Sequence, residues 1–179
     1  MCYNNYKIKN IKEKNNIEKN TKIIAAYPAC GKSYFTEHAE DFFDEEPFVI
    51  LDSDSSKFSW IYEDGDKTDK RNPDFPQNYI NYIKSNIGKA DIIFVSSHDI
   101  VRQALKKNNI KFTLVVPDKK CLTEWMLRFI NRGDDNVFVD NQIDNWDKWL
   151  TEIDEEKNTY SKLIKLNNHQ YIADVIHKC

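Results

Sequence analysis

Residues 26–33 read Ala-Tyr-Pro-Ala-Cys-Gly-Lys-Ser and carry the most recognisable chemistry in this sequence. They approach the G-x-x-x-x-G-K-[ST] pattern of phosphate-binding loops, with Gly31, Lys32 and Ser33 in register and Ala26 in place of the first glycine. Glycine lets backbone amides approach phosphate oxygens, lysine brings a positive charge, and the serine hydroxyl suits Mg²⁺. The stretch therefore predicts a site for ATP and Mg²⁺, and a turn between a strand and a helix is the alternative.

The residues around this motif are expected to share the site. Ala29, Cys30 and Tyr34 flank Gly31-Lys32-Ser33 and are predicted to contact the nucleotide. Cys30 would lie among backbone N–H donors at a helix N-terminus, which lowers the pKa of a thiol. We therefore expect Cys30 to react with thiol reagents and to be protected by nucleotide.

A second group of candidate residues follows another apolar run. Asp52 and Asp54 end the segment "VILDSD". A carboxylate can accept a hydroxyl proton or bind Mg²⁺ when it lies near a phosphate site. A turn or a helix cap is the alternative role, because aspartate favours both.

Five apolar, β-branched runs separated by helical patterns should position these groups. The runs cover residues 22–27, 48–53, 91–97, 111–117 and 161–166, and the first four are nearly continuous in apolar residues, as in strands covered on both faces. Helical patterns follow at "KSYFTEHAEDFF", "QNYINYIKSNIGKA", "DIVRQALKKNN", "KKCLTEWMLRFINRG", "DNQIDNWDKWLTEIDEEKN" and "QYIADVIHK". This alternation predicts a parallel sheet built from βαβ units. Trp125, Trp146 and Trp149 are expected in the core, and residues 62–76 as a mobile loop.

The composition limits the classes of function. The 179 residues carry a net charge of −3, so the basic surface of a nucleic-acid-binding protein is missing. No apolar run is long enough to span a bilayer, and the four cysteines form no metal-binding pair. These features predict one cytoplasmic domain over residues 21–179, no membrane association, and a Lys/Asn-rich flexible extension over residues 1–20.

The order of these segments resembles that of small P-loop kinases, the group of nucleoside-monophosphate kinases and shikimate or gluconate kinases. The resemblance covers roughly residues 21–178 and rests on the Gly-Lys-Ser motif, "VILDSDSSKF", "DIIFVSSHDIVRQAL", "FTLVVP" and "EWMLRFINRG". It implies a three-layer α/β P-loop fold with a five-stranded parallel sheet in the order 2-3-1-4-5. The third strand ends in Ser-Ser and lacks the usual acidic residue, which disfavours a mechanical ATPase.

The resemblance also implies roles for further residues. Asp52 and Asp54 match the Asp-x-Asp of shikimate kinases, which lies beside the mouth of the P-loop, so the resemblance implies that Asp52 binds Mg²⁺ together with Ser33. Ser96, Ser97 and His98, followed by Arg102, match the polar end of the third strand and the next helix of gluconate kinases, and Ser97, His98 and Arg102 are the implied acceptor contacts. Arg128 and Arg132 match the arginines of a lid helix that closes over ATP, with Gly133 ending the helix. Arg71 is a candidate contact with the acceptor. Solvated helix faces and caps are the alternative roles for these side chains.

The function predicted from these features is ATP-dependent phosphoryl transfer to a small acceptor, with a nucleoside or deoxynucleoside monophosphate as first choice. Lys32, Asp52, Asp54, Arg128 and Arg132 form the predicted catalytic set. A kinase of a sugar acid or another metabolite is the first alternative, since carboxylates suit a hydroxyl acceptor. A nucleotide-binding regulatory protein without turnover is the second, and a polynucleotide 5′-hydroxyl kinase is a weaker one because no basic groove is evident.

Overall fold

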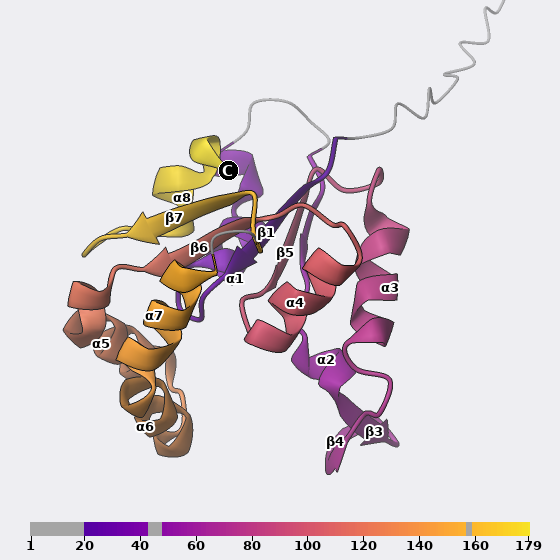
Figure 1. Cartoon of the computed structure of the whole chain (residues 1–179), viewed down its shortest axis with the longest axis horizontal. Coiled ribbons are helices and arrows are strands. Elements are labelled where there is room, and N and C mark those ends of the chain that lie inside the picture. Colours follow the sequence, from indigo (N-terminus) through magenta and orange to yellow (C-terminus); the bar gives the residue numbers. More distant parts are fainter. Residues whose placement is uncertain (1–19, 43–47, 157–158) are drawn as a thin grey trace, which may run out of the picture.

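Five parallel strands form the centre of the molecule in the computed structural model, which describes residues 20–42, 48–156 and 159–179 (Figure 1). They are β1 (Lys22–Ala26), β2 (Ile50–Asp52), β5 (Ile92–Ser96), β6 (Thr113–Pro117) and β7 (Lys162–Leu166). The order across the sheet is β2-β5-β1-β6-β7. This numbering differs from the predicted 2-3-1-4-5 because two unpredicted strands, β3 (Trp60–Glu63) and β4 (Asp66–Arg71), intervene in the chain and lie outside the sheet.

The three central strands are buried as their apolar sequences predicted. Residues 23–26 of β1, 92–95 of β5 and 114–117 of β6 are all buried. The edge strand β2 is only partly buried, and β7 alternates between exposed and buried positions at its end. Helices cover both faces of the sheet, which explains why its central strands lack polar alternation.

The helices form two layers. The longer ones are α3 (Gln77–Asn86), α4 (Asp99–Lys107), α5 (Leu122–Arg132), α6 (Asn136–Asp144) and α7 (Trp146–Glu155), and the shorter ones are α1 (Lys32–Glu37), α2 (Ser56–Ser59) and α8 (Ile172–Val175). Single 3₁₀ turns cover Ala39–Asp41, Lys119–Cys121 and Ile176–Lys178. In Figure 1, α4 and α7 lie in front of the sheet and α1 lies behind it, where α1 contacts α8.

The helical region after β6 differs from its prediction in one respect. Gly133 ends α5 with φ 83°, as expected for a left-handed C-terminal residue. The helix expected over residues 140–158 is instead two helices, and the first starts earlier because the Asp135 side chain accepts a hydrogen bond from the Phe138 amide at 2.9 Å. Trp125 and Trp146 are fully buried as predicted, and Trp149 is partly buried.

A hairpin replaces most of the loop predicted over residues 62–76. Strands β3 (Trp60–Glu63) and β4 (Asp66–Arg71) pair antiparallel and project beyond α2 (Figure 1). The turn residues Asp64 and Gly65 have φ of 52° and 93°, the double positive φ of a type I′ turn. The loop prediction was wrong because it relied on the polar composition of this stretch and overlooked the Asp-Gly pair, which favours a hairpin turn.

The predicted extension lies almost entirely outside the described residues. Within the described ranges, no helix is long and apolar enough to cross a membrane.

Candidate functional site

Three loops leave the carboxyl edge of the sheet side by side. Ala26 at the end of β1 pairs with Ser96 at the end of β5, and Asp52 at the end of β2 pairs with Phe94 in β5. The chain therefore brings the Gly-Lys-Ser loop (residues 27–33), the loop after β2 and the loop after β5 to one place. In open α/β sheets the crevice at this edge is the usual position of ligand sites.

The carbonyl groups of the Gly-Lys-Ser loop are held by donors around it. The carbonyls of residues 26 to 31 accept, in order, from Lys32 Nζ (3.2 Å), Cys30 N (3.4 Å), Trp125 Nε1 (3.1 Å), Arg128 Nη1 (3.4 Å), Ile172 N (2.9 Å) and Phe35 N (3.0 Å). The donors come from α8, from α5, from α1 and from the loop itself. Each of these six carbonyl oxygens, which would repel an anion if left free, thus accepts a hydrogen bond.

The amides of the same loop are not engaged. Within the described part of the chain, no residue accepts a hydrogen bond from the amides of Gly31, Lys32 or Ser33. Ala29 and Gly31 adopt φ of 61° and 88°, and this left-handed backbone is easy for glycine but uncommon for alanine. Engaged oxygens and free N–H groups together make a loop suited to an anion.

Two compartments open on either side of this loop and share Lys32, Ser33 and Arg132. The first has a volume of about 360 Å³ and is also lined by Ala29, Gly31, Tyr34, Arg128, Asn131 and Tyr171. The second has a volume of about 410 Å³, and its polar lining consists of Asp52, Ser53, Asp54, Ser55, Ser96 and His98. The sequence-predicted phosphate residues thus stand at the boundary between the two spaces.

Carboxylates and hydroxyls dominate the second compartment. Ser33 Oγ donates to Asp52 Oδ2 at 2.7 Å, so the predicted metal-binding pair is in direct contact. Asp54 accepts from the Ser56 amide at 2.8 Å and from the Ser56 hydroxyl at 2.6 Å, which is the predicted alternative role in a turn. Desolvation is the main cause that lowers the pKa of His98, and the positive charges of Arg102 and Lys32 lower it further. His98 is therefore a neutral group at pH 7 that remains accessible to water.

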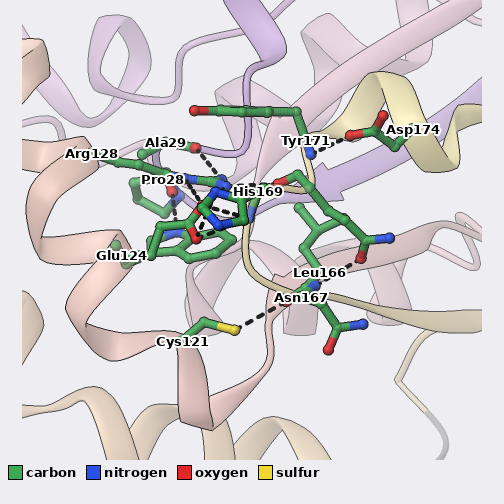
Figure 2. A network of polar contacts seen from close by, with 12 residues as sticks. Pro28, Ala29, Cys121, Glu124, Arg128, Leu166, Asn167, His169, Tyr171 and Asp174 are labelled. Atoms are coloured by element: carbon green, nitrogen blue, oxygen red, sulfur yellow. Dashed lines mark hydrogen bonds and ion pairs between the residues drawn. The ribbon is translucent and has the colours of Figure 1, made fainter.

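Arg128 is fixed in place behind the first compartment. Its guanidinium lies between the rings of Trp125 and Tyr171, at 4.0 Å and 3.9 Å from their centroids. It donates to the Ala29 and Gln170 carbonyls and pairs with Glu124 one turn earlier in α5. Figure 2 shows this network joining α5 to the Gly-Lys-Ser loop and to the segment before α8. Only 7% of the Arg128 side chain is exposed, so it acts mainly as a support for the loop.

Arg132, one turn further along α5, has a different environment. Its side chain is 45% exposed and lines both compartments. Asp134 accepts from Nε at 3.0 Å and from Nη2 at 2.6 Å, which occupies one edge of the guanidinium. The Asp134 amide itself donates to the Phe129 carbonyl at 3.1 Å, so Asp134 is anchored to the end of the helix. The remaining edge of Arg132 is available to a ligand.

Two residues predicted on the acceptor side lie elsewhere. Arg102 is 4% exposed and donates to Glu156 at 2.5 Å and to the Ser97 carbonyl at 2.5 Å, so it joins α4 to the end of α7. Ser97 is buried and lines neither compartment, whereas its neighbour Ser96 lines the second. The cause is the alternation of successive side chains at the end of a strand. Arg102 and Ser97 are therefore corrected to structural roles.

Arg71 stands apart from both compartments. It belongs to β4, and its guanidinium lies 3.7 Å from the centroid of the Trp60 ring across the hairpin. Lys67 contacts the same ring at 4.3 Å. Arg71 does not line the second compartment, so any contact with an acceptor would require the hairpin or the side chain to move.

Cys30 contradicts the expectation of a reactive thiol. Its side chain is fully buried beneath the loop, with Sγ 4.0 Å from the Val115 carbonyl. Burial raises the pKa of the thiol to about 11, which outweighs the opposing effect of the Lys32 charge. A helix N-terminus lowers a thiol pKa only when the sulfur points toward the exposed amides, and here it points into the core.

Tyr171 and Asn131 line the first compartment and were not predicted as site residues. Asn131 lies one residue before Arg132 in α5, so it shared a sequence signal with a predicted residue. Tyr171 lies 140 residues after Gly31 in the chain. Only the folded chain brings its ring to the loop, and no local pattern marks it.

Ser33 and Asp52 suit a magnesium ion, which commonly takes one or two protein oxygens and completes its shell with water and phosphate oxygens. Within the described ranges, no group of three or more His, Cys, Asp or Glu side chains is placed to hold a metal by itself. Comparison of the chain with protein-family models and with curated proteins gives no match.

Proposed function

We propose that this protein binds ATP with Mg²⁺ and transfers its terminal phosphoryl group to a small acceptor. The observation that carries the proposal is the position of Lys32, Ser33 and Arg132 at the boundary of two compartments. A phosphoryl group in transfer must contact a donor on one side and an acceptor on the other. Free amides and two positive side chains at that boundary provide the charge stabilisation that such a transfer requires.

The first compartment would hold the nucleotide. The amides of Gly31, Lys32 and Ser33 would donate to phosphate oxygens, and Lys32 would turn from the Ala26 carbonyl to the phosphates. Ser33 and Asp52 would bind Mg²⁺, which neutralises phosphate charge when bound. Arg132 would contact the transferring group with the guanidinium edge that Asp134 leaves free.

The second compartment would hold the acceptor. An acceptor oxygen attacks the γ-phosphorus, the bond from that phosphorus to the bridging oxygen of ADP breaks, and the acceptor proton passes to a carboxylate or to water. Asp54 and Asp52 lie on the acceptor side, and both favour a hydroxyl over a phosphate. Among the described residues, the only cationic side chains lining the compartment are Lys32 and Arg132, which also face the donor. These charges favour a metabolite with a free hydroxyl.

A nucleoside or deoxynucleoside monophosphate, the first choice from the sequence, is the second candidate acceptor. Its phosphate would stand near two carboxylates and would need an additional cation. Arg71 is the candidate for that role, because it is an exposed cation on the β3–β4 hairpin and was predicted from the sequence as an acceptor contact. Movement of Arg71 from the Trp60 ring would bring a guanidinium to the acceptor phosphate.

The test is ATP-dependent stabilisation of the folded protein with the variant Lys32→Ala. A ligand that binds only the native state raises its stability by mass action, so Mg²⁺-ATP should raise the Tm of the parent protein and leave that of Lys32→Ala almost unchanged. Lys148→Ala, at an exposed position of α7, is the matched control and should behave as the parent. Equal stabilisation of Lys32→Ala and the parent would exclude the proposed nucleotide site.

The acceptor class is tested by ADP release with matched pairs of compounds, such as a deoxynucleoside and its monophosphate, or a sugar acid and its phosphate. Faster release with the unphosphorylated member supports a hydroxyl acceptor. Faster release with the monophosphate supports the nucleoside-monophosphate alternative, and Arg71→Ala should then lower that rate. Binding of ATP without release above background, across the whole panel, would favour a regulatory nucleotide-binding protein.

A further inference from the structure

Among the described residues, four serines line the second compartment, and Ser55 is the one whose hydroxyl is both accessible and without a hydrogen bond. We propose that Ser55 is a site of self-phosphorylation, which receives the γ-phosphoryl group of ATP bound at the Gly-Lys-Ser loop of the same chain. This inference rests on the proposed function. It names a hydroxyl acceptor that the chain itself carries.

The other three hydroxyls are engaged or enclosed. Ser33 Oγ donates to Asp52 Oδ2 at 2.7 Å, and Ser96 Oγ accepts from the His98 amide at 3.4 Å. The Ser53 hydroxyl is enclosed, with only 5% of the residue exposed. An attacking oxygen must be free to approach phosphorus in line with the bond that breaks, so these three hydroxyls are poorer acceptors.

Ser55 precedes α2 but its side chain does not cap the helix. A serine at this position usually accepts a hydrogen bond from an amide of the first turn. Ser55 instead has a helical backbone, with φ −64° and ψ −18°, and no side-chain cap bond. Its carbonyl accepts from the Phe58 and Ser59 amides at 3.1 Å and 3.0 Å, which fixes the backbone. The hydroxyl is therefore held at the wall of the compartment without a role in the fold.

The proposed phosphate site and this hydroxyl share one space. Ser55 lines the same compartment as Lys32 and Ser33, the residues proposed to hold the phosphates and Mg²⁺. It follows Asp52 by three residues, which span at most about 11 Å when fully extended. Asp52 itself contacts Ser33. Such proximity replaces the encounter of two molecules by a step within one chain.

The step is a direct transfer from ATP to serine. Ser55 Oγ attacks the γ-phosphorus, the bond from that phosphorus to the β–γ bridging oxygen breaks, and ADP leaves with the electron pair. The hydroxyl proton passes to the carboxylate of Asp54, the preceding residue, or to water. Lys32 and Arg132 line the same space and would stabilise the charge of the transferring group.

Phosphorylation of Ser55 would close the compartment to other acceptors. The new group carries a charge of about −1.5 to −2 at pH 7. It would stand beside Asp52 and Asp54 in the space proposed for the acceptor. Lost volume and added negative charge both oppose the entry of an anionic metabolite. Self-phosphorylation should therefore stop after a single transfer and lower the turnover of an external acceptor.

The experiment incubates the protein with Mg²⁺-ATP labelled in the γ-phosphate, without an added acceptor, and locates the label by mass spectrometry. We expect the label on Ser55, and Ser55→Ala should reduce the labelling rate about tenfold or more, because other hydroxyls are not positioned for transfer. Ser55→Thr keeps a hydroxyl at this position and should carry phosphothreonine. Ser85→Ala, which removes a more exposed serine from α3, is the matched control and should be labelled as the parent is.

A mixture of the parent with a tagged Lys32→Ala chain separates transfer within a chain from transfer between chains. We expect the label on the parent alone, at a rate constant that does not depend on protein concentration. Label on the tagged chain would overturn the inference, as would label on Ser96 or Ser56 in place of Ser55.

Failure of this inference differs from failure of the proposed function. A parent protein that Mg²⁺-ATP stabilises but that gains no label would overturn self-phosphorylation and leave the nucleotide site in place. If Mg²⁺-ATP does not raise the Tm of the parent, the nucleotide site fails, and self-phosphorylation at Ser55 fails with it.

Discussion

The two compartments beside the Gly-Lys-Ser loop differ in how their walls are held. The first is backed by buried groups from distant parts of the chain, with Arg128 between two rings and bonded to the loop carbonyl of Ala29. The second has one contact between distant segments, Ser33 with Asp52, whereas its other carboxylate, Asp54, bonds to Ser56 two residues away. The first is therefore prepared for one ligand, whereas the second can rearrange its polar groups around an acceptor.

The two arginines of α5 show the same difference within a single helix. They are four residues apart and share a helix face, and the sequence predicted one role for both. Arg128 is enclosed by protein, and Arg132 faces the two compartments. The lesson is that a shared helix face does not imply a shared environment, because the segment before α8 covers the first arginine and leaves the second open.

The largest expected effect is on stability, for Arg128→Ala. Removal of one partner of a buried ion pair leaves Glu124 without its cation, and the Ala29 and Gln170 carbonyls lose a donor. We expect the free energy of unfolding to fall by about 3 kcal/mol, measured by urea denaturation. Arg132→Ala, on the same helix, should cost about 1 kcal/mol or less, because its ion pair is exposed. Equal costs for the two variants would contradict the distinction between the arginines.

Arg132→Ala should have its effect on turnover instead. If Arg132 contacts the transferring phosphoryl group, its loss should lower kcat by about 10²-fold and change the Kd for ATP much less. Lysine at position 132 should restore little of the rate, because a point charge cannot reproduce the planar guanidinium. Steady-state kinetics with the identified acceptor, alongside ATP binding, make the measurement. A variant with unchanged kcat would leave Arg132 as a surface residue.

Asp134→Asn should have a smaller effect on the same step. The amide keeps the size of the carboxylate but loses its charge, so Arg132 would be oriented less firmly at the boundary of the compartments. We expect kcat to fall about tenfold with ATP affinity nearly unchanged, by comparison with the larger loss for a missing charged donor. Asp135→Asn is the control, because asparagine also caps a helix and residue 135 bonds the Phe138 amide. Equal kcat in the two variants would show that Asp134 has no positioning role.

The smallest expected effect concerns acid stability and the wall of the first compartment. Burial acts to raise the pKa of Glu124, but the hydrogen bond from the His169 amide and the Arg128 charge outweigh it, so the pKa lies below its usual 4.5. A carboxyl with a lowered pKa stabilises the folded state above about pH 4.5, and this stabilisation is lost as the pH falls through the native pKa.

The Tm measured from pH 7 to pH 3 should therefore fall less for Glu124→Gln than for the parent, although the variant starts from a lower value at pH 7. Glu152→Gln, at an exposed position of α7, should retain the parent profile. A parent-like pH dependence in Glu124→Gln would mean that this carboxyl contributes nothing to acid unfolding.

Local sequence was enough to predict the five strands of the parallel sheet, the helix that ends at Gly133, and the Gly-Lys-Ser loop at the end of the first strand. A continuous apolar run predicts a strand that is buried on both faces, and a glycine such as Gly133 predicts the end of a helix. Each of these signals is contained within a few neighbouring residues. The resemblance to small P-loop kinases placed Ser33 and Asp52 at one Mg²⁺ site, and the two side chains are in contact. The hairpin of β3 and β4 was missed although its Asp-Gly turn was readable.

Only the tertiary structure decided which side chains face the compartments. Ser96 faces the second compartment and Ser97 the core, and a sequence cannot show where the alternation of a strand stops. Arg102 pairs with Glu156 at the end of another helix, and the Cys30 side chain is buried in the core. The Tyr171 ring lies beside Gly31, although the two residues are 140 positions apart in the sequence. The physical reason is that burial and pairing depend on segments that are distant in the chain, whereas periodicity and turn chemistry are local.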